Sequence, residues 1–268
     1  MNISILGCGW LGLPLAKRLI EAGHVIHGST TSRDKLSALR AEGIVPYEIQ
    51  LFEEGVQGDI SSFLGNSEIL IIDIPPGLRK DPKVNFVAKI NRLKSYIEKS
   101  GVEKVLFVSA TSVFKDRNDL PTYTEKDAPN GTAENAKQLI ETEELLKASE
   151  KFETSILRFG GLLGPGRHPV NYLAGKSELK DPEGPVNLIH LDDCIGIIEA
   201  IIEKEAWGEI FHGVYPEHPT RKEYYSRKAK EKGMAVMSFD EDSESKGKKI
   251  NSLNLNEVLG YEFKSSIY

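Results

Sequence analysis

The chain has 268 residues, with 34 Lys and Arg against 40 Asp and Glu and a formal net charge of −6. This length suits one large domain or a main domain with a smaller lobe, and a hydrophobic share of 40% is ordinary for a globular protein. The acidic balance argues against nucleic acid as the main partner. No apolar stretch approaches the roughly 20 residues that span a bilayer, so we expect no membrane segment.

The start of the chain and its two cysteines favour the cytoplasm. The first residues run directly into a strand-like segment and lack the basic region of a signal peptide. Cys8 and Cys194 lie in apolar or glycine-rich settings without metal-ligand spacing, which fits a reducing compartment. We therefore expect a cytoplasmic protein that binds no metal.

Short β-branched runs alternate with longer amphipathic segments through the first 160 residues, which predicts a parallel sheet covered by helices. The predicted strands are 2–6, 24–27, 44–49, 68–73, 105–109 and 155–159. The predicted helices between them are 11–22, 33–41, 84–99 and 134–147. Six strands joined by helical crossovers predict an α/β fold with a Rossmann-like, doubly wound parallel sheet.

After residue 160 the pattern becomes irregular and rich in glycine and proline. Helices are predicted over 193–203 and 221–232, with loops between them. We therefore divide the chain into a dinucleotide-binding domain over residues 1–160 and mixed segments over 161–268. These segments are expected to complete the sheet and to form a small C-terminal substrate lobe.

The glycine-rich segment between the first strand and the first helix is the strongest local signal. Gly7 permits a tight turn, Gly9 lets a pyrophosphate approach the backbone, and Gly12 lets the helix pack on the strand. The amino end of the helix then faces the phosphates, where its dipole favours negative charge. The segment predicts a dinucleotide site, and a glycine-rich turn without a ligand is the alternative.

The end of the second predicted strand bears on the choice of cofactor. NAD-binding proteins usually place an acidic residue there to hold the ribose 2′-hydroxyl, and this sequence has none. Thr31, Ser32 and Arg33 instead offer hydroxyls and a positive charge, which suit a 2′-phosphate. We therefore predict NADP rather than NAD. The alternative is that Thr31 and Ser32 only cap the second helix and that Arg33 is a surface side chain.

Four segments, at residues 7–12, 108–114, 157–166 and 187–193, together carry a family resemblance. Together they resemble the extended short-chain dehydrogenase/reductases of the NAD-dependent epimerase/dehydratase type, and most of all the atypical branch of that family. The resemblance covers most of the chain and implies an N-terminal cofactor domain. It also implies an oxidoreductase, or an epimerase- or dehydratase-like enzyme, that passes hydride at the nicotinamide of its cofactor and acts on a polar substrate such as a nucleotide sugar.

The catalytic pattern of this family is only partly present. In the family a Ser or Thr positions the substrate oxygen, a Tyr is the acid and base, and a Lys four residues later lowers the pKa of that Tyr and holds the nicotinamide ribose. Lys137 matches the family's Lys, whereas Ala110 and Ala133 stand where the two hydroxyl groups are expected.

Three interpretations of this departure remain open. In the first, Thr111, Ser112 or Tyr123 takes the vacant role. In the second, the reaction uses no Tyr, and a substrate group or another side chain handles the proton. In the third, the protein binds NADP without turning it over and is a sensor or regulatory module.

Further candidate contacts complete the predicted site. For the cofactor they are Trp10, Leu11, Ile74, Pro75, Ser109 and Lys137. Arg167, in the turn after the sixth strand, is the candidate to hold a substrate phosphate, and an Arg on a surface loop without such a role is the alternative. We expect a small-molecule substrate and a monomer or homodimer.

Overall fold

The structure, a computed structural model, describes residues 1–78 and 81–268. The chain divides into two compact units that interleave along the sequence. The first unit holds Met1–Ala110, Ala133–Leu157 and Ile198–Ile210, and the second holds Thr111–Thr132, Arg158–Ile197 and Phe211–Tyr268. The chain passes from one unit to the other at several points, one of which lies between Leu157 and Arg158.

A seven-stranded sheet has the order β12-β9-β7-β6-β1-β2-β3. Its strands are β1 (Asn2–Leu6), β2 (Val25–Thr30), β3 (Val45–Glu48), β6 (Ile69–Ile72), β7 (Lys104–Ala110), β9 (Glu153–Phe159) and β12 (Ile210–Gly213). β1 pairs in parallel with β2 on one side and with β6 on the other, so that Ile5 lies opposite both Gly28 and Ile71. The strand order therefore reverses at β1, which is where doubly wound sheets bind their ligands. The predicted Rossmann-like, doubly wound sheet is confirmed.

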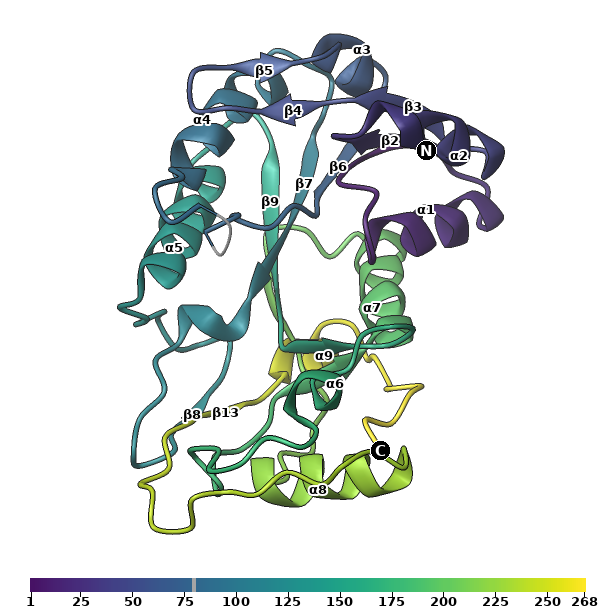
Figure 1. The fold of residues 1–268 in the computed structure, drawn as a ribbon. Helices are drawn as coiled ribbons and strands as arrows, with labels where there is room; N and C mark the ends of the chain where they lie inside the picture. Colours follow the sequence, from purple (N-terminus) through teal and green to yellow (C-terminus); the bar gives the residue numbers. More distant parts are fainter. Residues whose placement is uncertain (79–80) are drawn as a thin grey trace. The chain divides into compact units, whose positions relative to one another are not determined.

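Helices of the first unit pack on both faces of this sheet. They include α1 (Gly12–Glu21), the 3₁₀ turn η1 (Arg33–Lys35), α2 (Leu36–Ala41), α3 (Ile60–Leu64), α4 (Phe86–Ile97) and α5 (Glu134–Lys147). Figure 1 shows α4 and α5 side by side on one face and α1 on the other. Leu15 and Leu19 of α1 and Ile90 and Leu93 of α4 are at most 1% exposed, because each helix turns an apolar stripe towards the strands.

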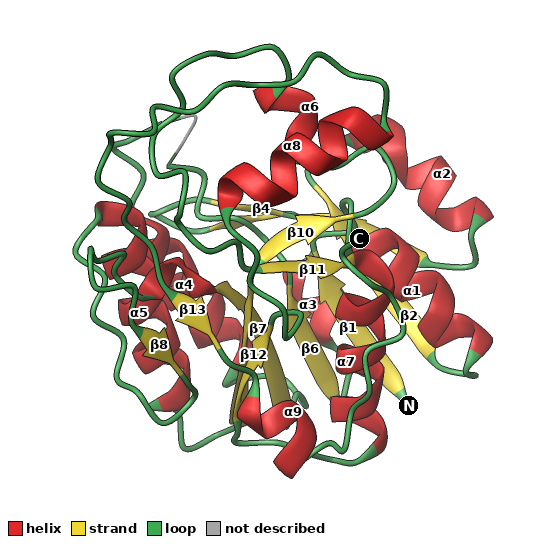
Figure 2. Cartoon of the chain, turned by 90° about the horizontal axis from the view of Figure 1, so that it is seen from below, coloured by secondary structure: helices red, strands yellow, loops and turns green. Residues whose placement is uncertain are grey.

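The second unit has an apolar cluster of its own. Its elements include η2 (Thr111–Val113), β8 (Thr122–Tyr123), β10 (Gly161–Leu163), α6 (Val170–Leu173), β11 (Leu188–His190), α8 (Arg221–Glu231), β13 (Lys249–Ile250) and α9 (Leu253–Glu257). β10 and β11 pair in parallel, and α6 lies against α8 (Figure 2). Val170, Tyr224 and Ile267 are buried in this cluster. A capping box of Thr220 and Glu223 begins α8.

Three elements remain to be described. β4 (Gln50–Leu51) and β5 (Val56–Gln57) form a small antiparallel pair after β3, and α7 (Leu191–Glu203) runs from the second unit into the first. Over residues 1–78 and 81–268, no helix has both the length and the apolar character needed to cross a membrane.

Candidate functional site

The turn between β1 and α1 places the three glycines where β1 ends. Gly7 has a φ of +109°, and a Cβ there would lie 2.3 Å from the carbonyl oxygen of Asp73, so only glycine fits. A Cβ on Gly12 would lie 2.2 Å from the carbonyl oxygen of Gly7. An added Cβ on Gly9 would lie 4.0 Å from the carbonyl oxygen of Gly7, the nearest described atom outside its chain neighbours. Packing inside the protein therefore explains Gly7 and Gly12, whereas Gly9 borders open space.

Ser29, at the end of β2, holds this turn in place. Its side-chain oxygen accepts the backbone N–H of Gly7 at 2.9 Å, and its carbonyl oxygen accepts the backbone N–H of Cys8 at 2.8 Å. Burial, with the negative charge of Asp73 as a second cause, raises the pKa of the Cys8 thiol to about 12. Cys8 therefore stays a neutral thiol and packs against the sheet rather than acting as a nucleophile.

The amino end of α1 suits an anion. Among the described residues no side chain caps this helix, and its first turn carries no acidic residue. The dipole of the helix and the N–H groups of its first turn therefore favour negative charge at this position.

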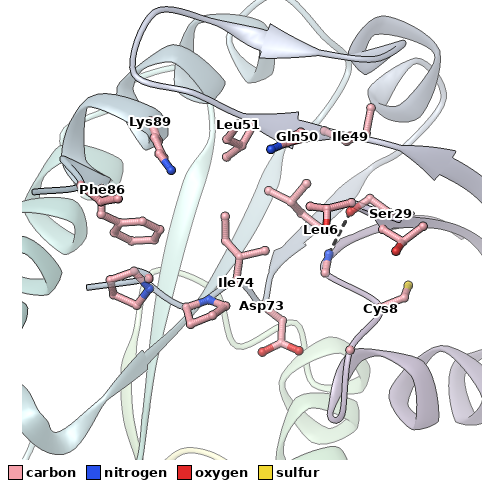
Figure 3. Close-up of a pocket in the computed structure, with 18 of the residues that line it drawn as sticks. Leu6, Cys8, Ser29, Ile49, Gln50, Leu51, Asp73, Ile74, Phe86 and Lys89 are labelled. Atoms are coloured by element: carbon pink, nitrogen blue, oxygen red, sulfur yellow. Dashed lines mark hydrogen bonds between the residues drawn. The ribbon is translucent and has the colours of Figure 1, made fainter. Parts of the chain in front are cut away.

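A cavity of about 490 Å³ adjoins the turn at the carboxyl ends of β1, β2 and β6 (Figure 3). Gly7, Gly9 and the end of β2 form one wall. Apolar side chains contribute much of the rest, and they include Ile49, Leu51, Ile74 and Phe86. Apolar walls around a concave space suit a flat ring system such as a nucleotide base.

Four polar side chains give this cavity its chemistry. Lys35 comes from η1, Gln50 from β4, Asp73 from the residue after β6, and Lys89 from α4. Figure 3 shows the Lys89 side chain reaching into the cavity and the Asp73 carboxylate on the side of the glycine turn. The Asp73 carboxylate lies 3.3 Å from the position that a Cβ on Gly12 would take. The cavity can therefore contact an anionic group and an uncharged ring at the same time.

The structure brings several of the predicted cofactor residues together around this cavity. Gly7, Gly9, Thr31, Ile74 and Pro75 line it. Ser32 and Arg33 do not belong to the described lining, and Lys35, two residues further on, supplies the positive charge on that wall. Trp10 is half-buried and Leu11 is buried in the turn itself.

Two predicted residues lie elsewhere in the first unit. The Ser109 hydroxyl, at the end of β7, donates a hydrogen bond of 2.6 Å to the buried carboxylate of Glu143 on α5. Lys137 is exposed in the first turn of α5, and its backbone N–H donates to the carbonyl oxygen of Ala133 at 3.0 Å. Ala133 therefore lies one helical turn before Lys137, the spacing at which the family places its Tyr and Lys.

The other candidates belong to the second unit. The Tyr123 ring is 7% exposed and stacks on Phe114, with 4.7 Å between the ring centroids. Its hydroxyl donates to the Lys115 carbonyl oxygen at 3.3 Å and accepts from the Asn130 side-chain amide at 3.1 Å. In η2, Thr111 is buried and Ser112 is exposed.

The turn that carries Arg167 is closed by a pair of backbone hydrogen bonds between Gly164 and Arg167. The Arg167 side chain is exposed on this turn in the second unit. Among the described residues, no three His, Cys, Asp or Glu side chains are grouped to hold a metal ion.

Four polar residues of the cavity were not predicted from the sequence: Lys35, Gln50, Asp73 and Lys89. Asp73 is the last residue of a predicted strand. Because ligands bind at the carboxyl ends of such strands, this position could have identified Asp73 as a site residue. Lys89 lies on a predicted helix and Gln50 follows a predicted strand, and neither has a local pattern that sets it apart from a surface residue.

The chain is similar in sequence to known proteins and similar in fold to a solved structure. No family model matches the chain. The chain is 33% identical over 265 residues to Protein YeeZ of Escherichia coli (strain K12), covering 98% of this chain and 95% of that protein. It is 28% identical over 232 residues to a 3-diazoavenalumate denitrifying reductase of Streptomyces sp, covering 78% and 74% of the two chains. Among solved structures, a UDP-glucuronic acid 4-epimerase of Bacillus cereus in complex with NAD has a TM-score of 0.81 at 17% identity, covering 99% of this chain and 92% of that one.

Proposed function

We propose that this chain, which belongs to the same family as Protein YeeZ of Escherichia coli, is a nicotinamide-dependent oxidoreductase or epimerase-like enzyme of the short-chain dehydrogenase/reductase type. Its substrate is a small polar molecule, and nucleotide sugars are the first class to test, because the structurally similar epimerase is named for one.

The observation that carries this proposal is the open space at Gly9 beside the cavity. Side chains of the protein do not require a glycine there, whereas a diphosphate resting against the turn does. The residues present fit a dinucleotide. The amino end of α1 suits the diphosphate, and the apolar walls, which include Ile49 and Phe86, suit the adenine ring. When bound, a nicotinamide dinucleotide supplies a hydride donor or acceptor at C4 of its ring.

We propose NADP as the preferred cofactor, although the epimerase with the similar fold is named with NAD. At the end of β2, the described lining of the cavity consists of Ser29, Thr30 and Thr31, and Lys35 follows in η1. A carboxylate at this position would repel a 2′-phosphate, whereas hydroxyls and an ammonium group can hydrogen-bond with it.

For the reacting end of the cofactor we propose that Lys137 contacts the ribose next to the nicotinamide. Its place one turn after Ala133 on α5 matches the family's Lys in spacing. Thr111, Ser112 and Tyr123 are the hydroxyl-bearing candidates for substrate contact in the second unit, and Arg167 is the candidate for a substrate phosphate.

The first experiment titrates the purified protein with NADPH and NADH and follows cofactor fluorescence. We expect saturable binding of NADPH in the micromolar range and weaker binding of NADH. A protein that binds neither reduced nor oxidised nicotinamide cofactors would refute the proposal. The rival function, an NADP-binding sensor without catalysis, predicts binding but no hydride transfer to any acceptor in a screen that includes nucleotide sugars.

A second candidate within the same family is a reductase that does not act on a sugar. The specific observation in its favour is the 28% identity to the denitrifying reductase over 232 residues. The two candidates differ in what happens to the cofactor, because an epimerase returns the hydride to its substrate, whereas a reductase consumes NADPH in proportion to the product formed. Measuring that proportion separates them.

A further inference from the structure

Lys89 is a positively charged side chain that faces the cavity. It lies in the first turn of α4, is half-buried, and lines the cavity together with Phe86 of the same helix. Over residues 1–78 and 81–268 its ammonium group forms no ion pair, whereas Lys94, the other lysine of α4, pairs with Glu98. An ammonium group beside apolar walls is unfavourable unless a hydrogen-bond acceptor meets it. A ligand with an acceptor atom at this place would satisfy it.

The contacts around α4 fix the position of this side chain. Asn85 and Arg92 lie four residues before and three residues after Lys89, on the same side of the helix. The Asn85 backbone N–H donates to the Glu53 carboxylate at 2.8 Å, and the Arg92 side chain donates to the Glu53 carbonyl oxygen at 3.1 Å. Glu53 lies in the turn between β4 and β5, so these bonds hold the start of α4 beside β4. Between them, the Lys89 side chain reaches into the cavity (Figure 3).

Gln50 is a second polar group at this end of the cavity. It begins β4, and its neighbours in the sequence, Ile49 and Leu51, belong to the apolar wall. Gln50 is exposed, and its side chain borders the cavity. Figure 3 shows Lys89 and Gln50 on the side of the cavity away from Cys8 and the glycine turn. An amide offers an acceptor oxygen and a donor NH₂ group, whereas an ammonium group only donates.

The proposed cofactor directs its base towards these two side chains. With the diphosphate at the amino end of α1 and the 2′-phosphate at Thr31 and Lys35, the adenine ring extends into the apolar part of the cavity. The ring is joined to the ribose through N9. Its opposite edge carries the acceptor N1 and the N6 amino group, the groups by which proteins recognise an adenine base. That edge therefore faces the wall that Lys89 and Gln50 form.

We propose that Lys89 selects adenine as the base of the cofactor, because its ammonium group donates to N1 while the Gln50 carbonyl oxygen accepts from the N6 amino group. The inference rests on the proposed nicotinamide cofactor and adds the residues that recognise its base. Hypoxanthine carries a hydrogen on N1 and an oxygen at C6. The Gln50 amide can turn to suit either base, whereas an ammonium group cannot accept the N1 hydrogen, so Lys89 carries the selectivity.

The experiment compares three reduced cofactors by equilibrium titration of the purified protein, followed by nicotinamide fluorescence. They are NADPH, NADH and deamino-NADPH, in which hypoxanthine replaces adenine. The wild type should bind NADPH at least about tenfold more tightly than deamino-NADPH. Lys89→Met should weaken the binding of NADPH and of NADH by roughly tenfold each and change that of deamino-NADPH by less than about twofold, because only an adenine base accepts from the ammonium group.

Two variants and a stability measurement control this experiment. Lys94→Met makes the same change in the same helix outside the described lining of the cavity, and it should keep wild-type affinity for all three cofactors. Lys89→Arg keeps a positively charged donor and should keep the preference for NADPH over deamino-NADPH. The melting temperature of Lys89→Met should stay within about 2 °C of the wild type, because the substitution breaks no ion pair among the described residues.

The outcomes separate this inference from the proposed function. If the wild type binds no nicotinamide cofactor, the proposed function fails and the inference fails with it. If NADPH binds and Lys89→Met weakens NADPH alone, the ammonium group contacts the 2′-phosphate. An equal loss for all three cofactors would mean a contact with the diphosphate or a ribose, and no loss would mean no contact. Each of these three results, or a wild type that binds NADPH and deamino-NADPH equally well, overturns the inference and leaves the proposed function standing.

Discussion

The surroundings of Gly9 differ from those of Gly7 and Gly12. A substitution at Gly9 can therefore test ligand binding without disturbing the packing of the protein. A Cβ at Gly9 would extend into the space beside the cavity, and the nearest described atom outside its chain neighbours would be the Gly7 carbonyl oxygen at 4.0 Å. Gly9→Val should therefore weaken NADPH binding by about 100-fold or more, as seen by fluorescence titration, because the side chain occupies the place of the diphosphate. The free energy of unfolding should change by less than about 1 kcal/mol.

Gly101→Val is the matched control for this prediction. Gly101 also borders open space, and it lies before β7, outside the described lining of the cavity. It should keep wild-type affinity. Wild-type affinity in Gly9→Val would mean that no cofactor contacts this turn.

Lys35 and Arg33 offer a second residue-level test, since only Lys35 belongs to the described lining. Removing its charge in Lys35→Met should weaken NADPH binding by about tenfold and leave NADH binding within about twofold, because only NADPH carries the 2′-phosphate. The measurement is a pair of equilibrium titrations for each protein.

Arg33→Met is the comparison variant, and it should affect neither cofactor. A loss of NADPH binding in Arg33→Met alone would return the role to Arg33, as the sequence suggested. An equal loss of both cofactors in Lys35→Met would show that the ammonium contacts a group other than the phosphate.

Glu125 joins elements of the second unit that are far apart in the sequence. Its carboxylate accepts the backbone N–H of His212 in β12 at 3.0 Å and that of Leu253, the first residue of α9, at 3.0 Å. Burial raises the pKa of this carboxyl group, and the backbone donors partly oppose that effect. One buried side chain therefore satisfies donors of two separate elements.

Glu125→Gln should lower the free energy of unfolding by about 1–3 kcal/mol, because the amide keeps one acceptor oxygen and turns its NH₂ group towards a backbone donor. Denaturant unfolding measures the change. Glu150→Gln, at an exposed site, is the control and should stay within about 0.5 kcal/mol of the wild type. A stability loss of the same size in both variants would contradict the assigned role.

The elements of this chain differ in how far the sequence predicts them. Residues 134–147 were predicted as a helix and form α5 with the same bounds, because an acidic start and a long amphipathic run are local signals. β10, β11 and β12 have only three or four residues each, too few to show a period of two, and their pairing partners lie far away in the sequence. The positions of these strands were therefore not predicted, although residues 161–268 were expected to complete the sheet.

The same distinction applies to the candidate site. Gly7, Gly9 and Pro75 were predictable because a strand, a turn and a strand end mark them locally. Lys35 and Lys89 reach the cavity from η1 and α4, and only the crossovers between parallel strands bring these elements to it. Residues that shape the backbone are therefore easier to predict from local sequence than side chains that reach the cavity from a helix.

The pKa values of the histidines indicate how the stability of the whole molecule depends on pH. The pKa values of His24, His168, His212 and His218 are all lowered, and burial is the largest cause for each. His212 is fully buried, and burial together with the nearby charge of Arg158 lowers its pKa from 6.5 to about 4. The fold therefore disfavours the protonated form of four of the six histidines.

This sets the direction of the pH dependence. A histidine whose pKa is lower in the folded protein binds its proton more readily in the unfolded chain, so its contribution to stability is complete above about pH 6.5 and is lost as the pH falls towards about 4. For His212 alone the loss is roughly 3 kcal/mol, at 1.36 kcal/mol for each unit of pKa.

Urea unfolding at pH 7.5, 6.0, 5.0 and 4.5 should show a free energy of unfolding that falls steadily. His212→Gln should be less stable at pH 7.5 and should show a shallower slope, because the group that titrates is gone while the other three histidines remain. A wild-type curve that is flat between pH 6.5 and 4.5, or a variant with an unchanged slope, would show that His212 is not held neutral by the folded protein.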